Sequence, residues 1–181
     1  KTIKKISTGR NEDKFGLTDS NFLKSINKFK NSTYLNIKCL SVHIGSQITS
    51  HIPYGKMLNI IDKIIKKSNH KFDYIDLGGG MGISYNYNTK KLNYKKYNSL
   101  INKFLKKKKS KIIFEPGRSI IGDTALLLTK VMYIKKTNKT NFVILDAAMN
   151  DLMRPALYGA KHKIIPSIKN RTIKNNKHEF V

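Results

Sequence analysis

The sequence predicts an α/β fold with parallel strands, followed by a smaller all-β unit. The prediction rests first on three short apolar runs, each ending in a turn that contains glycine, with segments of helical periodicity between them. It rests also on a change after residue 122, where two β-type runs follow one another with a polar turn and no helix between them. We therefore expect two domains, residues 1–122 and residues 123–181, of which the second is incomplete.

The apolar runs are the expected strands of the first domain. They are "IKCLSVH" (37–43), "FDYIDL" (72–77) and "KIIFE" (111–115). Near-continuous apolar runs of this length are typical of strands that are buried in a parallel sheet. Cys39 is the single cysteine and lies inside the first run, so it has no partner for an internal disulfide and we expect it in the core.

Helices are expected before and between these strands. Apolar side chains recur there at spacings of three and four, which gives each helix one apolar stripe facing a sheet. The stripes are Phe22, Leu23, Ile26 and Phe29; then Met57, Ile60, Ile61, Ile64 and Ile65; then Tyr94, Tyr97, Ile101, Phe104 and Leu105. Thr18 or Asp19 is a candidate N-cap of the first helix. The order αβαβαβ favours right-handed crossovers and parallel pairing.

The second domain is expected to open with a hairpin. Its two runs, "TALLLTKVMYI" (124–134) and "NFVILDA" (141–147), are joined by the polar segment "KKTNKT", so they predict antiparallel strands. The last segment, residues 166–181, has room for one or two further strands.

The formal net charge of +25 raises the possibility of a nucleic-acid or acidic-membrane partner. However, the basic residues are nearly all lysines scattered along the chain, and the aromatic residues fall on the predicted core stripes rather than along a basic groove. The lysine run at 103–111 is better explained as a solvated helix end before a strand than as a phosphate-binding patch. We expect no nucleic-acid partner, and a basic nucleic-acid-binding protein stays as the less favoured alternative.

Other classes of protein find no support in the sequence. The longest apolar runs, such as residues 125–128, are far shorter than the roughly 18 to 20 residues of a membrane-spanning helix. The N-terminal "KTIKKISTGR" lacks the apolar region of a signal peptide. No cysteine and histidine cluster suggests a metal site. We expect a cytoplasmic protein without a membrane partner or a bound metal.

The turns after the three strands are expected at one edge of the sheet. They are "HIGSQ" (43–47), "DLGGGMG" (76–82) and "EPGRS" (115–119). Ligands of parallel α/β folds bind at the C-terminal ends of strands. Gly78, Gly79 and Gly80 can present backbone N–H groups to an anion because no side chain covers them, and Gly45 with Ser46 adds an N–H and a hydroxyl. Together the turns predict a phosphate site.

An acid and an arginine follow the third strand. Glu115 beside a phosphate would repel it, unless the carboxylate faced a cation at the other end of the ligand, such as a protonated pyridine nitrogen. Arg118 has the reach for a phosphate or a carboxylate, which a guanidinium binds bidentately. A surface ion pair between Glu115 and Arg118 is the alternative.

These turns and one later motif resemble a known family. "HIGSQI", "DLGGGMGI", "EPGRSI" and especially "DAAMNDLMRPALY" (146–158) are similar, in order and spacing, to motifs of the diaminopimelate decarboxylases, which are fold type III enzymes that use pyridoxal phosphate. "ISTGRNEDKFGL" (6–17) is similar to a further segment of that family. Ornithine and arginine decarboxylases share the glycine loop and "EPGR" but not the last motif.

The resemblance implies a fold and a role for individual residues. The fold would be about the last three strands of a TIM-type (β/α)8 barrel, followed by the start of the β-domain of an alanine-racemase-like fold. Arg154 precedes Pro155, a typical first-turn residue, so we expect Arg154 at a helix entrance with Tyr158 one turn on. Pyridoxal 5'-phosphate would be bound by His43 (stacked on the ring), Ser46, Gly78, Gly79, Gly80, Glu115 (on the pyridine nitrogen), Pro116, Gly117 and Arg118, and substrate carboxylates by Arg118, Arg154 and Tyr158.

The activity that the resemblance implies is a carbon–carbon lyase reaction. The enzyme would convert meso-2,6-diaminopimelate to L-lysine and CO2, the last step of lysine biosynthesis, as a homodimer. Another fold type III decarboxylase, of the ornithine or arginine type, is the alternative. The family's Schiff-base lysine and its catalytic cysteine have no counterpart here, so the resemblance implies an internal fragment that contains no catalytic residue and is inactive alone.

Overall fold

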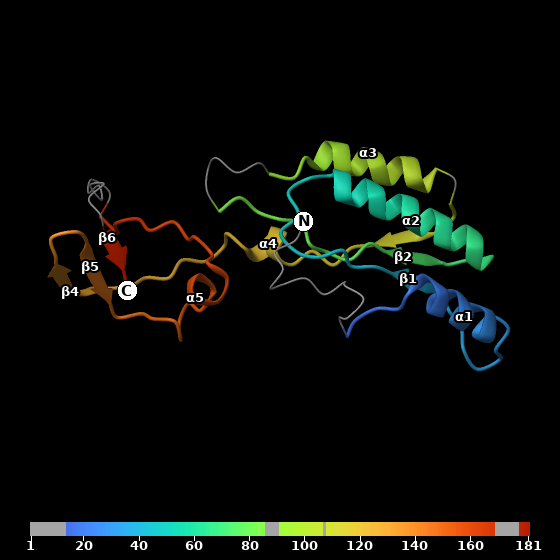
Figure 1. The fold of residues 1–181 in the computed structure, drawn as a ribbon. Coiled ribbons are helices and arrows are strands. Elements are labelled where there is room, and N and C mark those ends of the chain that lie inside the picture. The colour runs from blue at the N-terminus through green and yellow to red at the C-terminus, as the bar shows by residue number, and fades with distance from the viewer. Residues whose placement is uncertain (1–13, 86–90, 107, 169–177) are drawn as a thin grey trace. The chain divides into compact units, whose positions relative to one another are not determined.

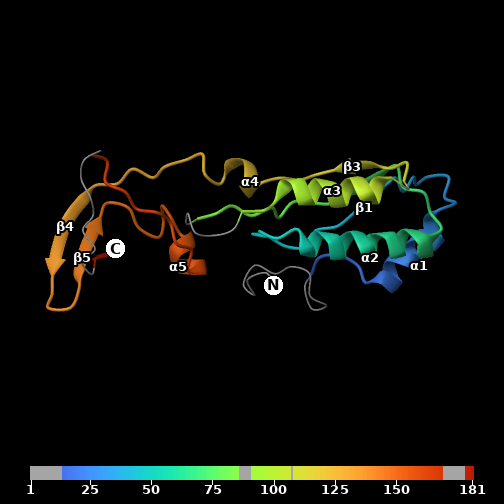
Figure 2. The ribbon, with the colours of Figure 1, turned by 90° about the horizontal axis from the view of Figure 1, so that it is seen from above.

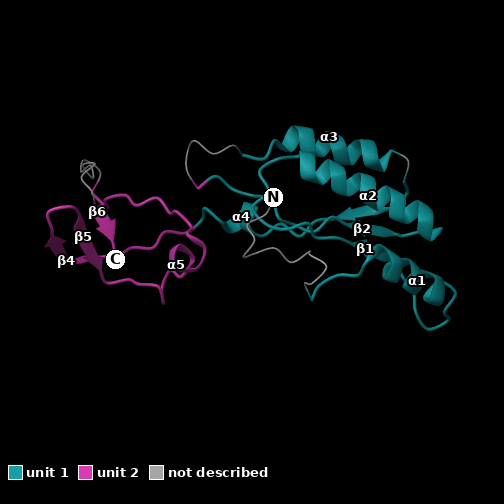
Figure 3. Cartoon of the chain, in the orientation of Figure 1, with its two compact units in different colours: residues 1–84, 90–124 teal, residues 85–89, 125–181 magenta. Residues whose placement is uncertain are grey.

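A computed structural model describes residues 14–85, 91–106, 108–168 and 178–181 of the chain. Residues 6–13 of the motif at 6–17 lie outside these ranges. The chain divides into two compact units, residues 1–84 with 90–124 and residues 85–89 with 125–181 (Figure 3).

A three-stranded parallel sheet forms the centre of the first unit. Its strands β1 (Cys39–Ser41), β2 (Tyr74–Asp76) and β3 (Lys111–Ile113) pair in that order, and Leu40, Ile75 and Ile112 lie in one row across them. Each strand lies within its predicted run but is shorter than that run. The predicted parallel pairing is confirmed.

Helices precede and separate these strands, as predicted. They are α1 (Asp19–Phe29), α2 (Ile52–Ser68) and α3 (Tyr94–Leu105), and a short α4 (Arg118–Ile121) follows β3. Thr18 caps α1, since its side-chain oxygen accepts a hydrogen bond from the Asn21 N–H at 3.3 Å. The helices α2 and α3 lie side by side over one face of the sheet (Figures 1 and 2).

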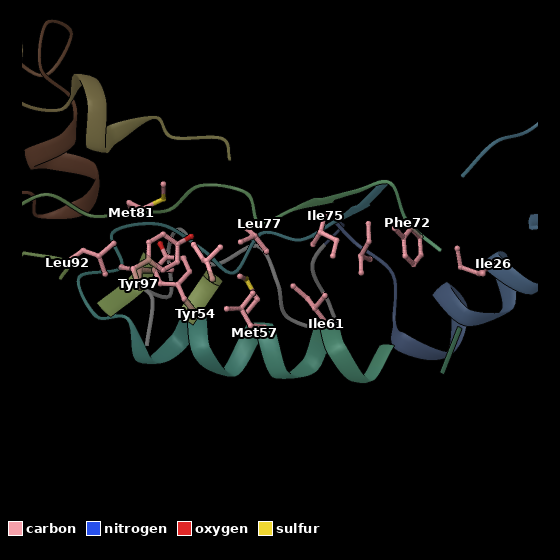
Figure 4. Packing of buried hydrophobic residues seen from close by; sticks show 14 residues of the cluster. Ile26, Tyr54, Met57, Ile61, Phe72, Ile75, Leu77, Met81, Leu92 and Tyr97 are labelled. Atoms are coloured by element: carbon pink, nitrogen blue, oxygen red, sulfur yellow. The ribbon is translucent and has the colours of Figure 1, made fainter. Parts of the chain in front are cut away.

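The hydrophobic core lies between these two helices and the sheet. Figure 4 shows Tyr54, Met57 and Ile61 of α2 directed toward Ile75 and Leu77 of the β2 segment. Tyr54, Ile75 and Leu77 have no exposed surface at all. Deep burial of this strand end fixes the backbone from which the following glycine turn begins.

The predicted helical stripes are wrong at Ile60 and Tyr94. Their side chains are 53% and 52% exposed, respectively. Each residue turns the helix by about 100°, so Ile60 lies a full step outside the stripe centred on Ile61, and Tyr94 is the first residue of α3. The predicted core position of Cys39 is also wrong. Side chains alternate along a strand, so Leu40 faces the helices while Cys39 lies on the face that the described residues leave exposed.

The second unit contains the predicted hairpin. Its strands β4 (Val131–Lys136) and β5 (Asn141–Leu145) are antiparallel, β6 (His178–Phe180) pairs in parallel with β5, and α5 (Arg154–Tyr158) is a short helix. The first half of the run at 124–134 is not a strand, and Leu126 is 91% exposed. The register explains this difference, because Val131 already pairs with Leu145, the last residue of β5.

Candidate functional site

The three predicted turns lie side by side at the C-terminal edge of the parallel sheet. Backbone pairing continues beyond the strands, where the Glu115 N–H donates to the Gly78 carbonyl and the Ile48 N–H donates to the Gly80 carbonyl, both at 2.9 Å. The segment of residues 78–82 is therefore bonded on one side to the turn after β1 and on the other to the turn after β3. The sequence-predicted site residues of these turns are brought together.

The glycines of the middle turn are required by the closeness of its neighbours. A Cβ atom on Gly79 would clash with the Glu115 carbonyl oxygen, and one on Gly80 with the Gly45 carbonyl oxygen. Gly78 and Gly80 also have φ angles of +62° and +83°, which side chains disfavour. No other residue type fits Gly79 or Gly80 without moving an adjacent turn.

Asp76 orients this turn. Its Oδ1 accepts the Gly78 N–H at 2.8 Å, and its Oδ2 accepts the Ser41 hydroxyl at 3.0 Å. Within the described ranges, the N–H groups of Gly79 and Gly80 have no protein acceptor. Two successive amides at the end of a buried strand are a suitable cradle for an anion, so this turn fits a phosphate group. Asp76 was not selected from the sequence, although an acid between a strand and a glycine run is a visible signal.

Tyr54 of α2 supports the glycine turn through a hydrogen bond. Its hydroxyl donates to the Gly79 carbonyl at 3.3 Å, and its ring packs on the ring of Tyr97 with centroids 4.5 Å apart. Burial raises the pKa of Tyr54, with a smaller contribution from Tyr97, so the hydroxyl stays protonated and remains a donor. Periodicity could place Tyr54 in the core, but no pattern in the sequence links it to a glycine 25 residues away.

The side chains around the glycine turn form an open rim. His43, Glu115, Pro116 and Gly117 are exposed and Ser46 is half-buried. The alternative ion pair between Glu115 and Arg118 is not what the structure contains, because the Arg118 Nη1 atom donates to the Gln47 Oε1 atom at 3.0 Å. No cation pairs with Glu115 among the described residues. Its carboxylate therefore remains available as an acceptor.

A hollow among the described residues lies away from the glycine turn. A shallow hollow of about 630 Å³ lies on the outward face of α3, between Lys95 and Lys106, and is lined by residues of that one helix only. Over the described ranges there is no group of three or more side chains suited to a metal ion. Nor does any helix in those ranges combine the length and apolar character needed to cross a membrane.

A second group of predicted site residues lies in the other unit. Arg154 begins α5, as expected, and its guanidinium carbon lies 5.7 Å from the ring centroid of Tyr158 and 5.9 Å from that of Tyr85. Its Nη2 atom is 3.5 Å from the Tyr85 hydroxyl. The two rings confine the guanidinium from different parts of the chain. Tyr85 was missed because 69 residues separate it from Arg154.

The two acids near α5 have structural partners. Asp146 Oδ1 accepts the Lys130 N–H at 2.8 Å and the Thr129 hydroxyl at 2.7 Å, and these bonds hold the pKa of Asp146 below its usual value. Asp151 Oδ2 accepts the Ala148 N–H at 2.9 Å and closes the turn before the helix. These acids organise the segment that carries Arg154.

Comparison with known proteins connects this geometry to a family. Residues 1–122 match the family model described as "Pyridoxal-dependent decarboxylase, pyridoxal binding domain". The chain belongs to this family. The cofactor of the pyridoxal-dependent decarboxylases fits the rim, since the Gly79 and Gly80 amides suit its phosphate and the Glu115 carboxylate suits a protonated ring nitrogen.

Individual relatives are similar over almost the whole chain. The diaminopimelate decarboxylase of Zymomonas mobilis is 40% identical over 167 residues, which are 90% of this chain and 40% of that protein. The crystal structure of diaminopimelate decarboxylase from Helicobacter pylori complexed with L-lysine aligns with a TM-score of 0.83 and 38% identity, over 92% of this chain and 43% of that one.

A more distant structure shares the fold. The lysine/ornithine decarboxylase of Vibrio vulnificus, complexed with cadaverine, aligns with a TM-score of 0.72 over 83% of this chain and 42% of that one, at 22% identity. The chain spans about 40% of the length of the curated relatives that it matches. Its similarity therefore bears on one part of such proteins.

Proposed function

We propose that this chain is part of a diaminopimelate decarboxylase, which converts meso-2,6-diaminopimelate to L-lysine and CO2 with pyridoxal 5'-phosphate. Support for this substrate comes from relatives of that name at 36–40% identity. In this proposal residues 1–122 are the last strands of a cofactor-binding barrel and residues 123–181 begin a β-domain. The Schiff-base lysine and the catalytic cysteine would lie outside the chain, and the whole enzyme would be a cytoplasmic homodimer.

The glycine turn would bind the phosphate of the cofactor. The amides of Gly79 and Gly80 donate to its oxygens, Ser46 adds a hydroxyl, and the Pro116–Gly117 turn closes the other side. The amide of Gly78 already bonds to Asp76, so its role is to set the direction of the turn. When bound, the cofactor withdraws the electron pair that the departing carboxylate leaves on the substrate α-carbon.

Glu115 would hold a proton at the ring nitrogen. A carboxylate that accepts a hydrogen bond from a pyridinium N–H stabilises the charged form of the ring. The backbone of Glu115 is fixed by the bond from its N–H to the Gly78 carbonyl, and its own carbonyl packs on Gly79. His43, whose Nδ1 atom lies 3.0 Å from where a Cβ of Gly78 would be, would cover one face of the ring.

Arg118, Arg154 and Tyr158 would bind substrate carboxylates. Diaminopimelate carries a carboxylate at each end, whereas ornithine and arginine carry one. A confined guanidinium binds a carboxylate bidentately and loses little freedom in doing so. Arg154, in contact with two tyrosine rings, is the residue that we expect to distinguish the two substrate classes.

One observation carries the proposal most directly. The Gly79 and Gly80 amides and the Glu115 carboxylate, which have no partner among the described residues, are joined at one sheet edge by the bond from Glu115 to Gly78. Donors for a phosphate and an acceptor for a ring nitrogen are the complementary groups for the two ends of pyridoxal phosphate.

The proposal is tested on the full-length enzyme that carries this chain. We expect CO2 release from meso-diaminopimelate, and none at a comparable rate from ornithine or arginine. Arg154→Ala should reduce kcat/KM for diaminopimelate at least about tenfold, because a charge-assisted contact to the carboxylate is lost. Lys161→Ala, an exposed cation near α5, is the matched control and should be neutral.

Three results would contradict it. Faster turnover of ornithine or arginine than of diaminopimelate would place the enzyme in the alternative class. Lysine formation by the isolated 181 residues would contradict the statement that the catalytic lysine lies elsewhere. Salt-sensitive DNA binding that ignores pyridoxal phosphate would instead favour the basic nucleic-acid-binding alternative suggested by the charge of +25.

A further inference from the structure

The Gln47 side chain forms hydrogen bonds with two other segments, one after the glycine turn and one after β3. Its Nε2 atom donates to the Ile83 carbonyl at 2.5 Å, and its Oε1 atom accepts the Ile83 N–H at 3.3 Å and the Arg118 Nη1 at 3.0 Å. Reversing the amide would place its NH2 group against two donors, so the bonds determine its orientation. One side chain thus joins the turn after β1 to the segment after the glycines and to the arginine of "EPGR".

We propose that Gln47 is a positioning residue that holds the Arg118 guanidinium ready for a ligand carboxylate. The inference rests on the proposed function, because it names the group that prepares one of the substrate-binding arginines. Gln47 is uncharged, so it fixes the guanidinium without cancelling the positive charge. A guanidinium has five N–H donors, and the bond to Gln47 sets its plane while occupying one of them.

The backbone of Gln47 points to the same constraint. Its φ of 60° lies in the left-handed region, which non-glycine residues seldom adopt and which is concentrated at functional sites. The conformation is held by close packing, because a Cβ atom on Gly82 would lie 2.9 Å from the Gln47 carbonyl carbon. The chain keeps an unfavourable backbone angle at a residue whose side-chain oxygen accepts a hydrogen bond from Arg118.

The stem of Arg118 is also held. Arg118 is the first residue of α4, and a Cβ on Gly122 would lie 2.9 Å from the Arg118 Cγ and 2.6 Å from the Ile83 Cδ1. Because Gly122 has no side chain, the aliphatic part of Arg118 and the side chain of Ile83 can pack closely against it. With the stem packed and the head bonded to Gln47, little freedom remains to be lost when a carboxylate binds.

The test uses the full-length protein and two ligands that differ by one carboxylate, L-lysine and cadaverine. Calorimetric titration should give about tenfold weaker L-lysine binding for Gln47→Met, the loss of one charge-assisted hydrogen bond. Cadaverine and pyridoxal phosphate affinities should change less than about twofold. Gln47→Glu should also weaken L-lysine binding, because its carboxylate pairs with Arg118 and cancels the charge. Since this variant also loses the donor to the Ile83 carbonyl, cadaverine affinity is the readout that separates the two effects: it should stay unchanged if Gln47 acts through Arg118 and fall with L-lysine affinity if the role is purely structural.

A double-mutant cycle isolates the coupling. In an Arg118→Ala background, Gln47→Met should have no further effect on L-lysine affinity, because its effect acts through Arg118. Asn69→Met is the matched control. Asn69 is the other non-glycine residue with a left-handed φ in the described ranges, at 46°, and it is the C-cap residue of α2. Its replacement should lower the melting temperature and leave L-lysine affinity unchanged.

Several results would overturn the inference. For Gln47→Met, these are equal losses of L-lysine and cadaverine affinity, or a loss of pyridoxal phosphate affinity with L-lysine binding intact. An effect of Gln47→Met on L-lysine affinity that persists in the Arg118→Ala background would also overturn it. So would the absence of L-lysine binding by the wild type. Failure of the proposed function is a separate result, namely a wild type that binds L-lysine but forms none from meso-diaminopimelate.

Discussion

Gly79 decides the geometry of the rim at the scale of single atoms. A methyl group there meets the carbonyl of Glu115, whose backbone is held by the bond from its N–H to the Gly78 carbonyl. We predict that Gly79→Ala in the full-length protein raises the dissociation constant for pyridoxal phosphate at least about tenfold, because the amide of residue 79 or the position of Glu115 must shift. The measurement is a titration of the apoprotein followed by absorbance.

Gly55→Ala is the control for that variant. Gly55 lies in α2, and its Cβ would lie 3.5 Å from a Leu100 side-chain carbon, an ordinary contact. Alanine is favoured over glycine in helices by about 1 kcal/mol, so the control should melt slightly higher and bind the cofactor normally. Equal affinity of the Gly79 variant and this control for pyridoxal phosphate would show that the glycine turn does not bind the cofactor.

Some of these residues could be predicted from the sequence, and others could not. The turns at 43–47, 76–82 and 115–119 were predicted to meet, because parallel strands place their C-terminal ends together. Gln47, Tyr54 and Tyr85 act through side-chain contacts that span 25 to 71 residues, and no local pattern encodes such distances. The bond between Arg118 and Gln47 was not predicted for the same reason.

At the scale of elements, an ion pair connects α2 to the segment before β3. Asp62 of α2 accepts from Lys108 at 2.6 Å and from Lys66 at 2.8 Å. The hydrogen bonds from Lys108 and then Lys66 lower the pKa of Asp62 from its ordinary 3.8. Lys108 also lies over the Phe104 ring, 4.9 Å from its centroid, so the pair fixes where β3 begins.

We predict a pH-dependent contribution of Asp62 to stability. A lowered pKa stabilises the folded state above pH 3.8, and the contribution is lost as the pH falls below that value toward the folded-state pKa. Asp62→Asn should lower the free energy of unfolding by about 0.2–1 kcal/mol at pH 7, because the pair is partly exposed. Urea unfolding at pH 7 and at pH 3 measures the difference, which should shrink at the lower pH. Asp73→Asn is the control and should be neutral at both values; a difference for Asp62→Asn that does not shrink would contradict the assignment.

The order of elements was predictable, and their extent was not. Periodicity identified α1, α2 and α3 and the three parallel strands, because each buries a face with a recognisable repeat. The prediction that Cys39 is buried was wrong, since described residues cover only one face of the sheet. A run of apolar residues does not show which side chains lie on that face. The first strand of the hairpin was overextended because its length is set by its partner β5.

At the scale of the whole molecule, the central claim is that one sheet edge, built from residues 43–47, 78–82 and 115–118, receives pyridoxal phosphate. A crystal structure of the full-length protein with the cofactor tests it most directly. The account predicts phosphate oxygens within about 2.7–3.2 Å of the Gly79 and Gly80 amide nitrogens, and a Glu115 carboxylate oxygen within the same distance of the ring nitrogen. A cofactor bound away from these amides, or one with Glu115 on another atom, would contradict it.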